Sequence, residues 1–203
     1  MQNIENIVQD VTGQDRRRTD RRSPRPHPLA QALDLALASG DAAVELLFQP
    51  QYDCTTGAIV GAEALARWQP PGRAAIAGDV LCAIAARSGL GPRLARHVVG
   101  SALAAARTWP AHLQVSLNLH PGDLADEGLV AMVEQALQES GVDPHRLTLE
   151  ITEQALVHDL EQSAASLQHL SDGGIRIALD DFGAGFCNFQ YLKLLPLDCL
   201  KLD

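Results

Sequence analysis

Two adjacent carboxylates, Asp180 and Asp181, stand where an alternating apolar and polar pattern gives way to a glycine-rich segment, 182–185. Two acids this close repel each other unless a cation, a base or a proton lies between them. The glycines that follow let the backbone turn tightly and approach a ligand closely. This strand end is therefore the first place where the sequence indicates chemistry.

Four further polar residues lie on stretches that alternate like strands, each on the face opposite the apolar residues: Glu63, Asn118, Glu150 and Lys201. Each is expected near the carboxyl end of its strand. In a barrel of parallel strands the inward-facing residues at these ends meet at one rim. We therefore expect the four to converge with Asp180.

Such a set of side chains is rich in oxygen atoms and in negative charge, so leaving it without a counter-ion would cost free energy. Hard divalent cations such as Mg²⁺ or Mn²⁺ suit ligands of this kind. With Asp181 adjacent, the set could hold two ions, which activate water and clamp the oxygens of a phosphodiester. Lys201 would stabilise developing negative charge or orient the water. The alternative is structural: a lone Glu or Asn at a strand end is often a cap, and Lys201 could be a counter-charge.

The elements that must position these residues alternate along the chain. We expect helices at 29–38, 79–88, 93–108, 127–140 and 160–170, and strands at 45–53, 59–68, 113–120, 146–153, 175–180 and 199–203. Repeated units of this kind predict a parallel sheet, either doubly wound or closed as a barrel.

The two faces of the strands favour the barrel. One face is apolar: Leu117, Leu119, Leu149, Ile151, Ile177, Leu179, Leu200 and Leu202. The other face carries the polar set. A doubly wound sheet has helices on both faces and would not gather polar groups on one of them. In a barrel the apolar face meets the outer helices and the polar groups point inward. The predicted fold class is therefore an α/β barrel.

Composition narrows the function classes. The chain has 203 residues, 46% of them hydrophobic, which suits one globular domain. Its net charge of −9 argues against binding a nucleic-acid polymer. There is no apolar run long enough for a membrane span and no signal peptide, so we expect a cytoplasmic protein. Residues 1–28 are polar, Arg-rich and proline-ended, which predicts a disordered tail before a domain at 29–203.

The residues themselves resemble a known family. The motifs are EAL at 63–65, NLH at 118–120, LEITE at 149–153, DDFGAG at 180–185 and KLD at 201–203. In this order and spacing they resemble the EAL domains, bacterial signalling phosphodiesterases that hydrolyse cyclic di-GMP to linear pGpG. The resemblance implies a TIM-like barrel whose first strand runs antiparallel to the others.

The resemblance also implies roles for individual residues. Mg²⁺ or Mn²⁺, as two ions, would be held by Glu63, Asn118, Glu150, Asp180 and Asp181. Glu63, Lys201 and Glu153 form the expected catalytic set, with Glu153 supporting the neighbouring loop and Lys201 near the attacking water. Gln49, Leu65 and Arg67 match positions that contact the nucleotide, and the Arg67 fork suits a phosphate. Residues 180–190 match a loop that couples the metal site to dimerisation, so a homodimer is a further expectation.

The chain departs from the family at its end. The expected barrel is incomplete, lacking the last two strands, and six strands cannot close an eight-stranded barrel. The strand of Lys201 would then be an unprotected edge. We therefore expect the isolated chain to turn over cyclic di-GMP slowly or not at all. The alternative function is a non-catalytic EAL remnant that binds cyclic di-GMP or a partner protein. A different metal-dependent barrel, such as a lyase or an enolase-like enzyme, is the rival class.

Overall fold

The computed structural model describes residues 27–39, 44–156, 160–183 and 191–202. The chain divides into two compact units, one of Met1–Glu45 with Ala66–Leu94 and the other of Leu46–Leu65 with Ala95–Asp203. The expected disordered tail lies almost wholly outside the described residues, which begin at His27. None of the helices within the described ranges has both the length and the apolar character required to cross a bilayer.

The first unit is built from two helices and a short strand: α2 (Pro28–Ser39), β3 (Ile76–Ala77) and α3 (Gly78–Arg87). Leu33 of α2 and Leu81 of α3 are fully buried, and the two helices pack against each other. Asp34 and Arg93 form an exposed ion pair. β3 pairs antiparallel with the end of β2, where Trp68 is fully buried. The sequence pattern predicted the two helices but not β3, which is too short to show a period of two.

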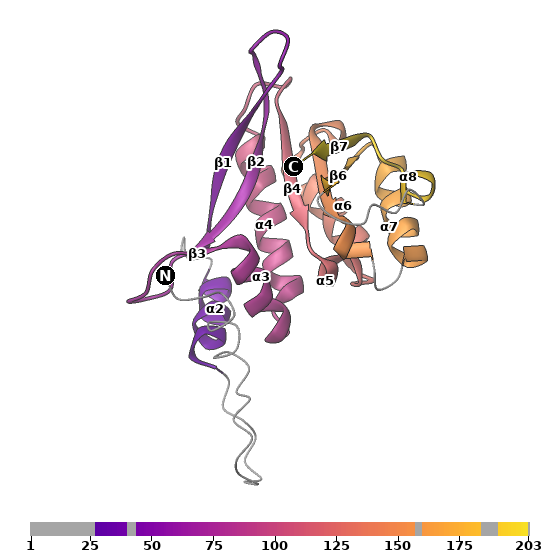
Figure 1. Ribbon diagram of the computed structural model, residues 1–203. Coiled ribbons are helices and arrows are strands. Elements are labelled where there is room, and N and C mark those ends of the chain that lie inside the picture. Colours follow the sequence, from indigo (N-terminus) through magenta and orange to yellow (C-terminus); the bar gives the residue numbers. More distant parts are fainter. Residues whose placement is uncertain (1–26, 40–43, 157–159, 184–190, 203) are drawn as a thin grey trace. The chain divides into compact units, whose positions relative to one another are not determined.

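Seven strands form one mixed sheet (Figure 1). Besides β3 they are β1 (Val44–Tyr52), β2 (Ile59–Trp68), β4 (Gln114–Leu119), β5 (Leu147–Thr152), β6 (Arg176–Phe182) and β7 (Cys199–Leu202). Their order is β1-β2-β4-β5-β6-β7, with β3 on β2. From β2 to β7 each neighbouring pair is parallel. The turn 53–58 between β1 and β2 is too short for a parallel crossover, so β1 runs antiparallel, as the resemblance implied.

Helices connect the parallel strands of the second unit. They are α4 (Gly91–Ala106), α5 (Pro121–Leu124), α6 (Leu129–Ser140), α7 (Leu160–Asp172) and α8 (Tyr191–Leu194), with the 3-10 turns η1 (Pro144–Arg146) and η2 (Glu153–Leu156). Gly141 ends α6 with a φ of 68°, and its N–H donates to the carbonyl of Leu137. That left-handed conformation is available to glycine at little cost, so it stops the helix sharply. α7 packs against both α6 and β6.

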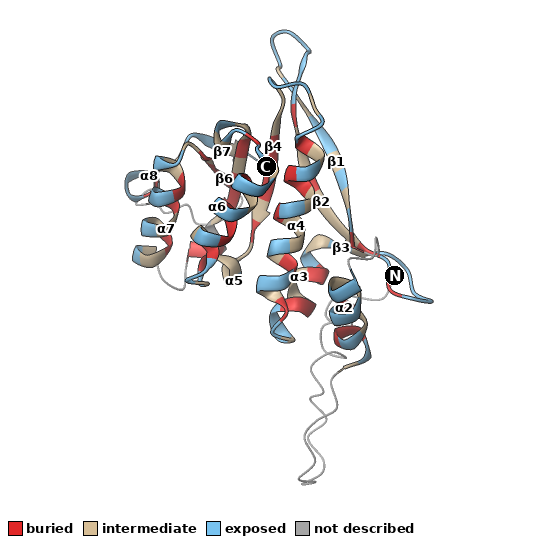
Figure 2. Ribbon diagram, turned by 180° about the vertical axis from the view of Figure 1, so that it is seen from behind, coloured by how far each residue is buried: buried red, intermediate tan, exposed pale blue. Residues whose placement is uncertain are grey.

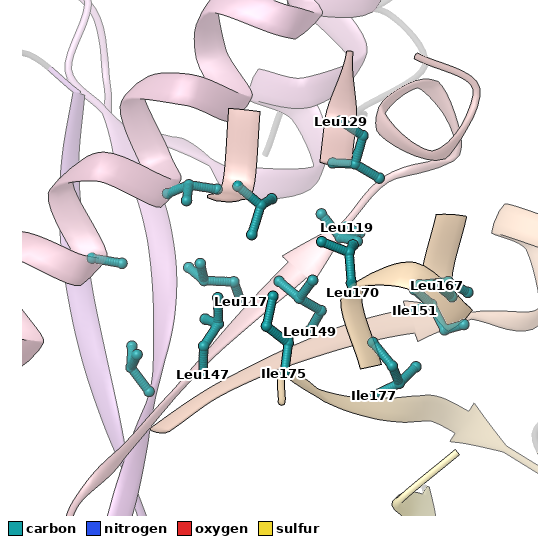
Figure 3. Close-up of a cluster of buried hydrophobic side chains, with 14 of the residues drawn as sticks. Leu117, Leu119, Leu129, Leu147, Leu149, Ile151, Leu167, Leu170, Ile175 and Ile177 are labelled. Carbon is teal, nitrogen blue, oxygen red and sulfur yellow. The ribbon is translucent and has the colours of Figure 1, made fainter. Parts of the chain in front are cut away.

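The hydrophobic core lies on the outer face of β4, β5 and β6. Figure 3 shows leucines and isoleucines of these strands close to Leu129 of α6 and to Leu167 and Leu170 of α7. Buried and exposed residues alternate along both helices with the period of a helix (Figure 2). Leu117, Leu149 and Ile177 are almost completely buried, which confirms the predicted apolar face on these three strands.

Two expectations differ from the structure, and a third, the barrel, is seen only in part in the described residues. Leu200 and Leu202 of β7 are 41% and 77% exposed, so the predicted apolar face ends at β6 among the described residues. Glu63 lies in the middle of β2 rather than near its end, because β2 continues past its pairing with β4 to pair with β3. β1 and β7 are the two ends of the strand order, and closure of a barrel is not seen in the described part.

Candidate functional site

Glu150 is more deeply buried than Glu63 and Asp180, two other acids of the predicted set. It sits on β5 between Asn118 of β4 and Ala178 of β6, and its side chain is only 1% exposed. Burial penalises the charged form and raises the pKa of Glu150, although a hydrogen bond and the charge of Lys201 act in the opposite direction. A carboxylate placed so deeply in the protein requires partners that satisfy its oxygens.

Lys201 of β7 supplies one of these partners and joins three carboxylates. Its Nζ lies 2.6 Å from Oε2 of Glu150, 3.0 Å from Oδ2 of Asp180 and 3.4 Å from Oε2 of Glu63. Burial alone would lower the pKa of Lys201, but hydrogen bonds to Glu150 and Asp180 and the nearby negative charges raise it above the usual range. Lys201 is therefore an ammonium group in this arrangement.

Glu63 and Asn118 complete the cluster. Nδ2 of Asn118 donates to Oε1 of Glu63 at 2.7 Å, while the other oxygen of Glu63 faces Lys201. Glu63 is paired with Ser116, two residues before Asn118 on the same face of β4. The structure thus brings together five of the predicted site residues: Glu63, Asn118, Glu150, Asp180 and Lys201.

Asp181 differs from its neighbour Asp180. Its side chain is exposed, and its φ of 55° lies in the left-handed region that costs energy for residues other than glycine. Its N–H donates to Oδ1 of Asp180 at 3.0 Å, and the pairing of β6 with β7 is irregular between Leu179 and Phe182. Strain of this kind is often found at functional sites, where the surrounding structure holds it in place.

The chemistry of the cluster fits a hard divalent cation, because its donors are carboxylate and amide oxygens and its one ammonium group leaves it negatively charged. Its arrangement is a separate matter. Among the described residues, no three or more His, Cys, Asp and Glu side chains are disposed to hold a metal ion. The three carboxylates converge on the ammonium group of Lys201 instead.

The other predicted residues lie elsewhere on the chain. Gln49 is exposed on β1, and Leu65 is half-buried on β2. Arg67 belongs to the other compact unit, where its Nη1 donates to the carbonyl of Ala66 at 2.8 Å. Glu153 begins η2, and its side chain lies outside what the structure describes, as do residues 184–190 of the expected dimerisation loop. The roles of these residues stay predictions.

Two polar residues that the sequence did not single out join the inner face. Ser116 is 2% exposed, and its Oγ accepts a hydrogen bond from Nε2 of Gln51 at 3.0 Å. Ser116 also acts to lower the pKa of Glu150, against the larger effect of burial. The period of two could have found them, since Ser116 lies two residues before Asn118 and Gln51 two residues after Gln49.

Comparison with known proteins identifies relatives of this chain. An uncharacterized signaling protein of Caulobacter vibrioides is 36% identical over 172 residues, covering 85% of this chain and 21% of the relative. The uncharacterized protein y4lL of Sinorhizobium fredii is 34% identical over 168 residues, covering 83% of this chain and 20% of the relative. The chain thus spans about a fifth of the length of these two relatives.

Solved structures similar to this chain have the same fold. The PaMucR phosphodiesterase in its c-di-GMP complex is 33% identical, with a TM-score of 0.77 over 87% of this chain and 71% of that chain. The FimX EAL domain of Pseudomonas aeruginosa bound to c-di-GMP has a TM-score of 0.78, over 87% of this chain and 71% of that chain. At 24% identity it supports the fold alone.

The family assignment rests on all of the second unit and part of the first. The family model described as the EAL domain matches residues 30–203. Within that range lie the EAL motif at 63–65 and every residue of the polar cluster. The chain belongs to the EAL domain family.

Proposed function

We propose that this domain binds cyclic di-GMP and, with Mg²⁺ or Mn²⁺, hydrolyses it to linear pGpG. The observation that carries the proposal is the convergence of Glu63, Asn118, Glu150 and Asp180 around Lys201 in a chain of the EAL family. A phosphodiesterase solved with this dinucleotide, one-third identical in sequence, supports the choice of substrate. Family membership also argues against a lyase or an enolase-like enzyme.

In this proposal the metal ligands are the oxygens of Glu63, Asn118, Glu150, Asp180 and Asp181, and two ions are bound. When bound, the ions supply Lewis acidity that stabilises phosphodiester oxygens and favours ionisation of water. Binding them requires that the carboxylates turn at least partly away from Lys201. Glu150 is the most constrained of the ligands, because its side chain is almost fully enclosed.

The protein's own groups have distinct tasks. The ammonium group of Lys201 donates hydrogen bonds to a phosphate oxygen or to the attacking water and stabilises negative charge as it develops. Asn118 fixes the orientation of Glu63 through its amide. Gln49, Leu65 and Arg67 contact the nucleotide, where the Arg67 guanidinium suits a phosphate. Glu153 supports the adjacent loop, and a homodimer completes the proposal.

A second candidate function is binding of cyclic di-GMP without turnover. The observation that favours it is the closed arrangement of the cluster, in which one ammonium group engages all three carboxylates. An ammonium group that is already paired lowers the attraction of the site for divalent cations. Such a domain would act as a cyclic di-GMP receptor or as a protein-interaction module.

Chromatography of the nucleotides separates the two functions. The chain is incubated with cyclic di-GMP and Mn²⁺, with Glu63→Ala as the blank and EDTA as a second blank. We expect pGpG to form at most slowly with the wild-type chain and to be absent from both blanks. Binding of cyclic di-GMP without any pGpG would support the receptor function, and the absence of both would contradict the proposal.

A further inference from the structure

A pocket opens on the second unit, at the end of the strands opposite to the polar cluster. Its volume is about 310 Å³, and its lining comes from α6, α7 and the segments that lead into β5 and β6. Ile175, which lines it, directly precedes β6, whereas Asp180 of the cluster lies toward the carboxyl end of that strand, ~16 Å away along an extended chain. The pocket is therefore separate from the candidate catalytic site.

The floor of the pocket is apolar and belongs to the hydrophobic core. It is formed by side chains that are each less than a tenth exposed: Leu137, Val142, Leu170 and Ile175. Leu170 and Ile175 are among the core side chains drawn in Figure 3, so the rest of the core holds this floor in place. A preformed apolar floor of this size accepts one ring or a short branched alkyl group, since a cavity of about 150 Å³ already holds benzene.

The rim of the pocket carries a carboxylate. Oε1 of Glu134 on α6 lies 3.1 Å from Nε2 of His169 on α7, and both residues line the pocket. Both side chains are more than half exposed, so a ligand can reach them. An ionised carboxylate has two oxygens and about four acceptor positions, and the contact with His169 uses one of these. Glu134 can therefore accept further hydrogen bonds from a ligand.

The ends of two helices add to the negative character of the rim. Leu137 and Gln138 lie in the last turn of α6, and Gly173 directly follows α7. Carbonyl groups at the C-terminus of a helix carry partial negative charge, which favours a cation nearby. The last turn of α6, which the structure describes throughout, contains no basic residue that would offset this charge. The pocket therefore favours a positively charged ligand group over a carboxylate or a phosphate.

A bare metal ion and a protein surface both suit the pocket less well. Glu134 and His169 are two donors, and no group of three or more His, Cys, Asp and Glu side chains in the described part of the chain is placed to hold a metal ion. A stable protein interface buries about 800 Å² on each partner, which is far more than a single pocket provides. The ligand that fits is a free small molecule with an apolar body and one ammonium group.

We propose that this pocket binds a small amphiphilic amine, with the apolar part of the amine on Leu170 and Ile175 and its ammonium group on Glu134. The proposal is independent of the proposed function, because it involves neither the polar cluster nor a nucleotide. It therefore requires a test that measures binding at the pocket itself.

The probe is phenethylamine, a phenyl ring joined to an ammonium group at neutral pH. Phenethyl alcohol has nearly the same shape without the charge, and ethylamine has the charge without the ring. Each compound is titrated into the isotope-labelled full chain while the amide signals are followed by NMR. We expect the shifts to centre on the amides of Leu137, Leu170 and Ile175. Phenethylamine should bind about two- to fivefold more tightly than the alcohol, as is typical of a charge pair partly open to solvent, and ethylamine more weakly than either.

Glu134→Gln removes the charge of the rim and keeps the size of the side chain. Glu139→Gln is the matched control, because Glu139 is also exposed on α6 but accepts a hydrogen bond from Gln135 and does not line the pocket. The preference for the amine over the alcohol should disappear in Glu134→Gln and persist in Glu139→Gln. Both replaced side chains are exposed, so both variants should fold.

Three results would overturn the proposal. The first is an unchanged preference for the amine in Glu134→Gln, which would remove the role of the carboxylate. The second is a set of shifts centred away from Leu137, Leu170 and Ile175, which would place the binding elsewhere. The third is the absence of shifts with every probe at millimolar concentrations.

Discussion

The two faces of β4, β5 and β6 are made by alternate residues of the same strands, and they differ in almost every physical respect. The outer face is leucine, isoleucine and valine, almost completely buried in a core to which α6 and α7 contribute. The inner face holds Asn118, Glu150 and Asp180 in a network of hydrogen bonds and ion pairs. The outer face contributes the hydrophobic effect, which has no preferred direction. The inner face fixes charged groups in defined positions.

This difference shows which face stabilises the fold. Burying apolar area is favourable, at roughly 25 cal/mol per Å². Burying a carboxylate is unfavourable unless its partners compensate, and an apolar replacement is often no less stable. A cluster such as Glu150 with Lys201 is therefore retained for what it does rather than for stability. The predictions that follow test this division from the largest expected effect to the smallest.

The largest effect is expected on the outer face. Leu149 is completely buried, so Leu149→Ala should lower the free energy of unfolding by about 2–5 kcal/mol in urea titrations. Leu202→Ala is the control, because that side chain is 77% exposed and should change stability by less than about 0.5 kcal/mol. Equal losses from both substitutions would contradict the assignment of the core.

A smaller loss is expected when Lys201 is removed from the inner face. Lys201→Met leaves Glu150 buried without its ammonium partner and should cost roughly 2–3 kcal/mol in urea unfolding without divalent cations. The double variant Lys201→Met with Glu150→Gln should regain part of the loss, since both charges are then gone. A double variant less stable than Lys201→Met would show that the unpaired charge of Glu150 does not cause the loss.

The same substitution should make stability depend on pH. Without Lys201, the hydrogen bond and charge that lower the pKa of Glu150 are lost, and burial, which raises it, remains. Between the pKa of an unfolded glutamate and the higher folded value, the folded state binds more protons, so stability falls as pH rises. The stability deficit of Lys201→Met relative to wild type should therefore grow as pH rises above the pKa of an unfolded glutamate. A constant deficit over this range would contradict the raised pKa.

The smallest effect is expected at the turn between β1 and β2, away from both faces. Oδ1 of Asp53 accepts from the N–H of Thr56 at 2.7 Å and from its hydroxyl at 2.9 Å, which lowers the pKa of Asp53. Its contribution is present above the pKa of an unfolded aspartate and is lost as pH falls through the lower folded value. Asp53→Ala should lower the melting temperature slightly at neutral pH, and the difference should shrink in acid. A difference that grows in acid would exclude this cause.

Much of the architecture was predictable from the sequence. Alternation along β4, β5 and β6 is strict, so Leu117, Leu149 and Ile177 were assigned correctly to the buried face. The polar residues of the other face followed from the same period. Three of them pair with Lys201, and Asn118 joins the cluster through Glu63. Local periodicity identifies the faces because each strand has one side in the core.

Other features were not predictable because they depend on which strand lies beside which. Leu202 alternates like a buried residue, yet no described element covers it. The burial of Ser116 and its contact with Gln51 require β1 and β4 to be in place around β2. The convergence of the carboxylates on an ammonium group rather than on an open position is likewise a matter of geometry, which residue types alone do not determine.

The most direct test of the division between the two faces is calorimetric titration of the folded chain with Mn²⁺. Wild type, Glu63→Ala and Asp180→Asn are compared, with Leu202→Ala as a control on β7. A functional inner face predicts that wild type and Leu202→Ala bind alike, while both carboxylate variants bind at least about tenfold more weakly and remain folded. Equal binding by all four proteins would contradict a cation site at Glu63 and Asp180.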